Sequence, residues 1–389
     1  MAISSRRGST FVELAIVMLL IGLLGTILIP AIQRAKEKSQ RSRCAYNLRR
    51  IIHGVVKYEN SQGSFPPGRL FPDRLNANGD PIVTSNYSGV SPGETSGYYS
   101  VHIWILPYVK AGHIFDLIDF DVPLIKILHP GNPNTEAFTQ PMPLYLCPSD
   151  SDTSSGLTDN NYRCNFGGDT PGAGQRTVNS IVRNPRPSDL WHPGGNGAFT
   201  LGETGPMAKD TGLMPKDFVD GISKTVFFSE RTKGAGDSFR KVPTITDMIR
   251  CPGRGITPAD PIEFVFQAAE SYVPEFSHFV FTNAGRWSER ENYSNGWPFA
   301  GYDSTQYNHV APPNWNSIDC GVSFISDTPG EHAIIAARSE HPRFVNVAYG
   351  DGHVKAINDE IDLTVWRALG TRNGGETVPE KKRRRRNRW

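Results

Sequence analysis

The sequence predicts an α+β protein in which a long N-terminal α-helical spine packs on a loop-rich, mainly antiparallel β-sheet head. Residues 11–32 form an almost continuous apolar run, and residues 33–62 extend it with an amphipathic pattern of helical period. Downstream, short apolar or aromatic runs alternate with Gly, Pro, Asn and Asp, which is typical of short strands joined by turns. Gly and Pro contribute 38 and 30 of the 389 residues, and this abundance argues against a helical bundle.

The apolar run at 11–32 is long enough to cross a membrane. As a helix it would extend about 33 Å, and the hydrocarbon core of a bilayer is about 30 Å thick. The alternatives are a buried core helix and a cleaved secretory signal, but the apolar stretch of a signal is usually only about 7–15 residues long. We therefore expect a retained transmembrane segment. Glu13 is its one charged residue and needs a partner, because an unpaired carboxylate in lipid is costly.

Beyond the apolar run, the helix is expected to continue to residue 62. Apolar residues recur every three or four positions and predict one stripe that packs on the head: Cys44, Leu48, Ile51, Val55 and Tyr58. The arginines between them are expected in solvent or against an acidic surface: Arg41, Arg43, Arg49 and Arg50. Gly63 and the following Pro66-Pro67-Gly68 should end the helix.

Charge is segregated along the chain. The formal net charge is only +2, yet residues 1–33 carry +1, residues 34–50 carry +6 and residues 380–389 carry +6, which leaves −11 on residues 51–379. The C-terminal segment 379–389 is too charged to fold, so we expect a basic disordered tail. Such a tail suits an anionic polymer, the acidic body of another subunit, or no dedicated partner at all.

The residues from Arg6 to Glu13, together with the apolar helix behind them, resemble the leader and helix of type IV prepilins and type II secretion pseudopilins. The resemblance implies that a prepilin peptidase removes residues 1–8 by cutting between Gly8 and Ser9, and methylates the new amine. It implies an assembly role for Glu13, which in that family pairs with the N-terminal ammonium of a neighbouring subunit, and a helix kink at Pro30. Ser9 departs from the Phe usual at that position.

The resemblance also implies a single-pass protein of the inner (cytoplasmic) membrane with an extracytoplasmic head at 63–378, displayed at the membrane or in a surface filament. Charge alone predicts the opposite orientation, because more lysines and arginines follow the span than precede it. Long domains cross membranes largely regardless of flanking charge, so we favour the orientation that the leader implies.

Further segments resemble a planctomycete-type family of pilin-like proteins, which joins a prepilin-type N-terminus to a C-terminal His-x9-Asp-Gly motif. The matching segments occur in the family's order: 63–68, 105–108, 146–150, 218–230, the motif at His341, Asp351 and Gly352, and 363–370. The resemblance implies a fold and assigns no biochemical activity.

The motif has a structural and a chemical interpretation. Val345, Val347 and Tyr349 alternate before Gly350-Asp351-Gly352, which predicts a β-hairpin with a tight Asp-Gly turn and His341 at the start of its first strand. A catalytic or metal-binding role for His341 and Asp351 is the alternative, but no third partner can be identified. We favour the hairpin.

The five cysteines show no CxxC or zinc-finger spacing: Cys44, Cys147, Cys164, Cys251 and Cys320. An exported protein could form up to two disulfides and keep one thiol. The first candidates are Cys147 with Cys164 and, because the spine must be fixed to the head, Cys147 with Cys44.

No metal or cofactor is expected. Two loops carry clustered polar residues without the alternating ligands of a calcium loop, and we interpret them as solvated turns: Asp150, Asp152 and Asp159, and Asn76, Asn78 and Asp80. No GxSxG, P-loop, GxGxxG or HExxH motif occurs in a convincing context, so an enzyme is not expected.

The sequence thus favours a structural subunit of a type IV pilus or type II secretion-like assembly. Its expected partners are prepilin peptidase, the inner membrane, other pilin or pseudopilin subunits and, through the tail, an anionic polymer. The alternative is a membrane-tethered extracytoplasmic binding protein that captures a ligand or polymer without forming filaments.

Overall fold

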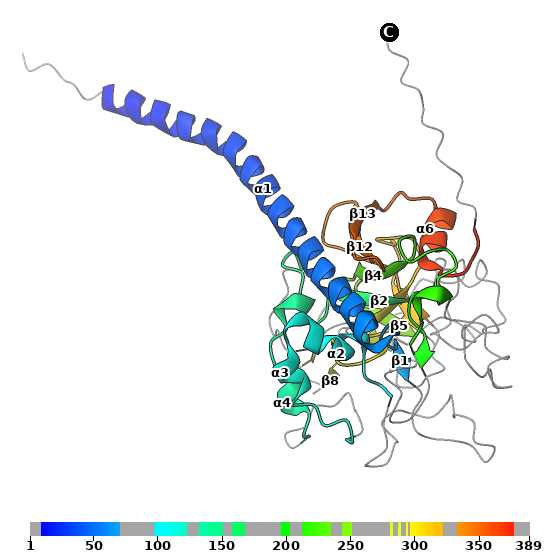
Figure 1. Ribbon diagram of the computed structural model, residues 1–389. Helices are drawn as coiled ribbons and strands as arrows, with labels where there is room; N and C mark the ends of the chain where they lie inside the picture. The colour runs from blue at the N-terminus through cyan, green and yellow to red at the C-terminus, as the bar shows by residue number, and fades with distance from the viewer. Residues whose placement is uncertain are drawn as a thin grey trace, which may run out of the picture.

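The computed structural model describes residues 9–70, 97–122, 132–150, 158–167, 196–202, 212–234, 243–250, 281–282, 287–288, 293–294, 296–321 and 333–376. In this part of the chain, one long helix projects from a head built around a five-stranded sheet (Figure 1). This is the α+β spine-and-head architecture expected from the sequence. The leader 1–8 and the tail 379–389 lie outside the described residues.

Helix α1 (Ser9–Gln62) is 54 residues long and continues through Pro30. All five residues of the expected apolar stripe, from Cys44 to Tyr58, are at most 3% exposed, which confirms the face that packs on the head. The helix ends where Gly63 adopts a φ of +78° and its N–H donates to the carbonyl of Glu59 at 2.7 Å. Figure 1 shows the first half of α1 extending away from the head and the second half lying against it.

The central sheet has the strand order β13-β12-β4-β2-β9. Its strands are β2 (Tyr162–Gly167), β4 (Val226–Glu230), β9 (Gln306–Asn308), β12 (Phe344–Tyr349) and β13 (Val354–Asn358). Neighbours pair antiparallel except β2 and β9, which are parallel. All residues of β2 and β4 are buried, because α1 and other segments of the head cover the sheet.

A smaller sheet has the order β11-β10-β5-β6, and two short pairs join β1 to β3 and β7 to β8. These strands are β1 (Arg69–Leu70), β3 (Leu201–Gly202), β5 (Met248–Arg250), β6 (Phe281–Thr282), β7 (Trp287–Ser288), β8 (Tyr293–Ser294), β10 (Asp319–Gly321) and β11 (Ala333–Ile334). Each is only two or three residues long, as expected for a chain rich in turns.

Short helices complete the head: α2 (Val101–Trp104), η2 (Leu106–Val109), α3 (Gly112–Phe115), α4 (Thr135–Phe138), η3 (Pro143–Tyr145), η6 (Pro215–Asp217) and α6 (Leu363–Gly370). Helix α6 begins after Asp362, whose carboxylate accepts from the N–H groups of Thr364 and Val365. The indole of Trp366 on α6 is fully buried and stacks on His309, with ring centroids 3.8 Å apart. This contact fixes the C-terminal helix to the core.

The apolar face of α1 joins the main hydrophobic core of the head, together with aromatic residues of the central sheet. Gly54 shows how closely they approach: a Cβ there would lie 2.6 Å from Cγ1 of Val109 on η2. The second half of α1 is therefore part of the head, and the first half is not.

Candidate functional site

The projecting half of α1 exposes an apolar surface. Its large apolar side chains between residues 11 and 32 are each about half exposed or more, for example Phe11 at 79% and Leu19 at 72%. The most apolar stretch has a mean hydropathy of 2.7, and none of it is buried. By length and composition, α1 is the one helix in the described part of the chain that is able to span a membrane.

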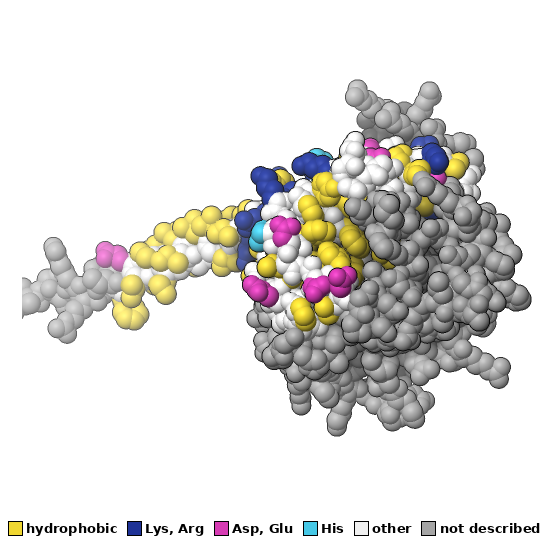
Figure 2. Space-filling view, turned by 60° about the horizontal axis from the view of Figure 1, so that its bottom comes forward, with side chains coloured by type: hydrophobic (Ala, Val, Ile, Leu, Met, Phe, Trp, Pro, Cys, Tyr) yellow, Lys and Arg dark blue, Asp and Glu magenta, His cyan; other side chains and the backbone are white. Residues whose placement is uncertain are grey.

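A basic segment follows the apolar one, where the helix reaches the head. Arg34, Lys36, Lys38 and Arg43 are exposed, and Figure 2 shows lysine and arginine side chains gathered at the junction of helix and head. Arg41 is half-buried because its guanidinium lies 4.6 Å from the centre of the Phe344 ring, at the start of β12. Figure 2 also shows the apolar surface ending at this junction.

A disulfide between Cys44 and Cys147 fixes α1 to the head across 103 residues of sequence. Of the two bonds suggested by the sequence, the one between Cys147 and Cys164 is wrong. Cys164 lies inside β2, where its thiol donates to the carbonyl of Thr305 at 3.2 Å, and its burial raises the pKa of the thiol. Cys320 is also disulfide-bonded, and Cys251 lies outside the described residues.

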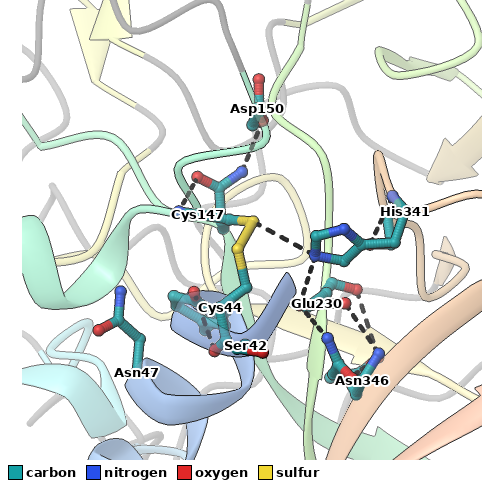
Figure 3. Close-up of polar contacts among 12 residues, drawn as sticks. Ser42, Cys44, Asn47, Cys147, Asp150, Glu230, His341 and Asn346 are labelled. Carbon is teal, nitrogen blue, oxygen red and sulfur yellow. Dashed lines mark hydrogen bonds and ion pairs between the residues drawn. A yellow bond between two sulfur atoms is a disulfide. The ribbon is translucent and has the colours of Figure 1, made fainter. Parts of the chain in front are cut away.

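His341 lies beside this disulfide and Glu230 (Figure 3), and it also contacts Glu37. Its Nδ1 is 2.7 Å from Oε1 of Glu37 on α1, and its Nε2 is 3.6 Å from Oε1 of Glu230 at the end of β4. The same Nε2 is 3.8 Å from Sγ of Cys147. The ring is almost completely buried, whereas Glu37 lies at the rim with 36% of its side chain exposed.

Asn346 on β12 fixes the position of the Glu230 carboxylate. Its backbone N–H donates to Oε2, and its side-chain amide donates to Oε1, both at 2.8 Å. Burial alone would lower the pKa of His341, but the hydrogen bonds and negative charges of Glu230 and Glu37 raise it above the ordinary value. The cluster thus places a buried imidazole between two carboxylates and a disulfide.

The loop that carries Cys147 is held by Asn161. The N–H of Cys147 donates to the Asn161 side-chain oxygen at 2.9 Å, and the Asn161 amide donates to Asp150 at 2.6 Å. A cavity of about 10 Å³ lies alongside, with Cys147, Asp150 and Glu230 in its lining, and has room for about one water molecule. This cavity cannot hold an organic ligand.

Asp150 and Asp159 are buried, so the interpretation of this loop as a solvated turn is wrong for both. Asp159 forms a fully buried ion pair with Lys233 at 3.0 Å, and Asp150 also accepts from the backbone N–H of Lys233 at 2.9 Å. Buried carboxylates need such partners, because desolvation penalises an unpaired charge. Asp152 and residues 76–80 lie outside the described residues.

The His-x9-Asp-Gly segment forms the predicted β-hairpin. Strands β12 and β13 pair antiparallel, His341 precedes β12, and the turn includes Gly352 with a φ of +95°. Asp351 lies in that turn, at the opposite end of β12 from His341, and its carboxylate meets the exposed His353 at 2.6 Å. The structure therefore does not bring His341 and Asp351 together in one site.

The partners of His341 were missed in the sequence because they come from distant segments. Glu37 is 304 residues away, yet it is the one acidic residue in the basic stretch 34–50. Glu230 is the last residue of the segment 218–230 that resembles the pilin-like family, and this resemblance could have marked it as a candidate site residue. No local spacing connects either residue with the hairpin.

The remaining candidates lie at the N-terminus. Gly8 lies outside the described residues, and Ser9 is the first residue of α1. Glu13 is exposed on the apolar half of the helix, and no residue in the described ranges forms an ion pair with it.

The comparisons with known proteins give one match. The family described as "Protein of unknown function (DUF1559)" matches residues 33–364, a region that begins directly after the apolar segment and ends in α6. No curated protein and no solved structure matches the chain. Because the match covers most of the 389 residues, the chain belongs to the DUF1559 family.

Proposed function

We propose that this chain is a membrane-inserted, prepilin-peptidase-processed structural subunit of a pilin-like or pseudopilin-like assembly, with its head outside the cytoplasm. The observation that carries the proposal is the division of α1, which has an exposed apolar half and a half built into the head. One helix thus supplies both an anchor and part of a folded core.

The exposed apolar half needs a non-aqueous environment. Monomeric soluble proteins rarely expose contiguous apolar patches of more than a few hundred Å², and this surface surrounds the whole helix. Before assembly, a lipid bilayer would cover this apolar surface. In the core of a helical filament, the apolar helices of neighbouring subunits would cover it instead.

Glu13 supports assembly beyond simple anchoring. Its carboxylate lies on the apolar surface, and its own subunit offers it no ion-pair partner among the described residues. A carboxylate inside the hydrocarbon region of a membrane is energetically costly unless it is paired. The amine of Ser9, once freed by cleavage, is a suitable partner on a neighbouring subunit.

The first experiment identifies the mature N-terminus of the full-length chain by mass spectrometry, in cells with and without prepilin peptidase. We expect a chain that begins at Ser9 only when the peptidase is present. An intact Met1 in both strains, or a cut beyond Ala31, would show that the processing claim is wrong.

The second experiment compares Glu13→Leu with Glu59→Leu, which removes a carboxylate from the part of the same helix that lies on the head. We expect Glu13→Leu to reduce cross-linked multimers at least tenfold, whereas both variants remain in the membrane fraction. If Glu13→Leu assembles like Glu59→Leu, the chain is better described as a tethered binding protein that forms no filaments.

A further inference from the structure

We propose that Cys44, Cys147, His341 and Glu230 bind one zinc ion when the Cys44–Cys147 disulfide is reduced. This proposal does not depend on the assembly function proposed above. It assigns to the buried cluster a second state in which a metal replaces the covalent bond between α1 and the head.

The four ligand atoms are already gathered. The two sulfurs, an imidazole nitrogen and a carboxylate oxygen all lie within 4.8 Å of one another. Sγ of Cys147 is 3.8 Å from Nε2 of His341, which is 3.6 Å from Oε1 of Glu230. Bond lengths to zinc of about 2.3 Å for sulfur and about 2.0–2.1 Å for nitrogen and oxygen give tetrahedral ligand separations of about 3.4–3.8 Å.

The donor types also suit zinc. Two thiolates, one imidazole and one carboxylate form a tetrahedral set of the kind that zinc accepts, whereas calcium and magnesium require oxygen ligands. The ligands come from α1, the loop after η3, the end of β4 and the segment before β12. The fold therefore brings together four ligands that no sequence spacing would reveal.

Neighbouring groups orient the ligands as they do in known zinc sites. Glu37 accepts from Nδ1 of His341 at 2.7 Å, so Nε2, which lies 3.8 Å from Sγ of Cys147, is the nitrogen that binds zinc once it has lost any proton. Asn346 holds both oxygens of Glu230. The ligands thus need little rearrangement beyond separation of the two sulfurs.

The two states interconvert by balanced chemistry. A dithiol, or a phosphine with water, gives the S–S bond two electrons and two protons and becomes a disulfide or a phosphine oxide. Zinc then binds the two sulfurs as thiolates and the imidazole through Nε2, with release of the two thiol protons and of the Nε2 proton of any His341 that is in the imidazolium form. In the reverse direction, a small-molecule disulfide such as oxidised glutathione accepts two electrons from the thiolates. The Cys44–Cys147 bond re-forms, two glutathione thiolates leave, and zinc is released because the sulfurs are no longer thiolates.

The test uses the full-length chain in detergent, reduced with a phosphine that is then removed without air. Zinc binding is measured by competition with a coloured chelator, and cobalt serves as a spectroscopic substitute. We expect one equivalent of zinc and a tetrahedral cobalt spectrum with thiolate charge-transfer bands in the reduced chain. The oxidised chain should show neither.

Variants show which residues bind. The double variant Cys44→Ser/Cys147→Ser retains the sulfurs of Cys164 and Cys320 but should no longer bind zinc. Cys164→Ala should bind zinc like the wild type. His341→Ala and Glu230→Gln should weaken binding at least a hundredfold, whereas His353→Ala, at an exposed histidine outside the cluster, should not. Glu37→Gln should weaken it about 10–100-fold, the usual effect of losing a group that orients a ligand.

Three results would overturn the proposal: zinc bound equally by the double cysteine variant, unchanged affinity in both His341→Ala and Glu230→Gln, or an octahedral cobalt spectrum. Circular dichroism identifies any variant that fails to fold. In that case the wild-type cobalt spectrum decides, because it reports thiolate ligation and geometry without any substitution.

Discussion

His341 connects three parts of the chain. Its ring meets Glu37 of α1 and Glu230 of β4, and its backbone leads into β12. A histidine in a plain hairpin would need none of these contacts. The other two motif residues lie at the far end of the hairpin, where Gly352 provides the positive φ of the turn.

At this scale we predict that Gly352→Ala lowers the free energy of unfolding by about 1–2 kcal/mol, because a residue with a Cβ is strained at positive φ. The new Cβ would also lie 3.1 Å from the ring of His53 on α1. Urea unfolding of the full-length chain in detergent measures the change.

The matched control is Asp351→Ala, one position earlier in the same turn. Its side chain is 41% exposed and, among the described residues, its carboxylate pairs with the exposed His353 alone, so the loss should stay within about 0.5 kcal/mol. The reverse order of the two effects would contradict the structural interpretation of the motif.

At the scale of elements, α1 has an exposed part and a part that packs on the head, and the boundary between them lies near residues 37–44. Before this point its side chains are exposed, and after it they alternate between solvent and the core. The side-chain amide of Gln40 donates to the carbonyl of Pro148 at 2.8 Å, next to the Cys44–Cys147 bond. The helix is therefore fixed to the head at the point where it first reaches it.

We predict that Cys44→Ser/Cys147→Ser lowers the free energy of unfolding by about 2–5 kcal/mol, because the bond closes a long loop in the unfolded chain. Its two cysteines are 103 residues apart. Denaturant unfolding of the metal-free chain, followed by tryptophan fluorescence, provides the measurement. Cys164→Ala removes a buried sulfur without removing a disulfide, and an equal loss in both variants would show that the bond itself contributes little.

At the scale of the whole molecule, the head keeps two histidines neutral in its interior. Burial lowers the pKa of His102 and of His309 to about 3 in each case. Both imidazoles hydrogen-bond to backbone carbonyls at 2.8 Å, that of Tyr162 for His102 and that of Trp366 for His309. Above pH 6.5 each histidine is neutral in both the folded and the unfolded chain.

Below pH 6.5 the unfolded chain binds protons that the folded chain excludes, so acid should destabilise the fold. Lowering the pH from 7 to 5 should cost about 2 kcal/mol for each histidine, and the loss should continue towards pH 3. We predict that His309→Asn removes about half of this loss, as measured by urea unfolding across that range.

The wild type and His309→Asn share all other titrating groups, including His341 and the carboxylates. The contributions of these groups therefore cancel when the two pH profiles are subtracted. Parallel pH profiles for the wild type and His309→Asn would contradict the prediction.

Features set by neighbouring residues could be predicted from the sequence. The apolar stripe of α1, its end at Gly63 and the β12–β13 hairpin depend on periodicity and turn chemistry within short segments. The parallel pairing of β2 with β9 and the placing of β4 between β2 and β12 join distant segments, and no local pattern specifies them.

The candidate site was harder to predict for the same reason. His341 and Cys147 were recognised, but Glu37 and Glu230 reach them only through the fold. The buried Asp159–Lys233 pair shows a related limit, because a charged residue in a polar loop has the same local sequence whether it is solvated or paired.

The Cys44–Cys147 bond has a mechanical consequence. A force that pulls the apolar end of α1 away from the head reaches the loop after η3 through a covalent link near the start of the buried half. The buried part of the helix beyond Cys44 then carries little of the tension. Under such a force, the backbone hydrogen bonds of the projecting half of α1 should break first. This half should therefore unfold and lengthen before the buried half separates from the head.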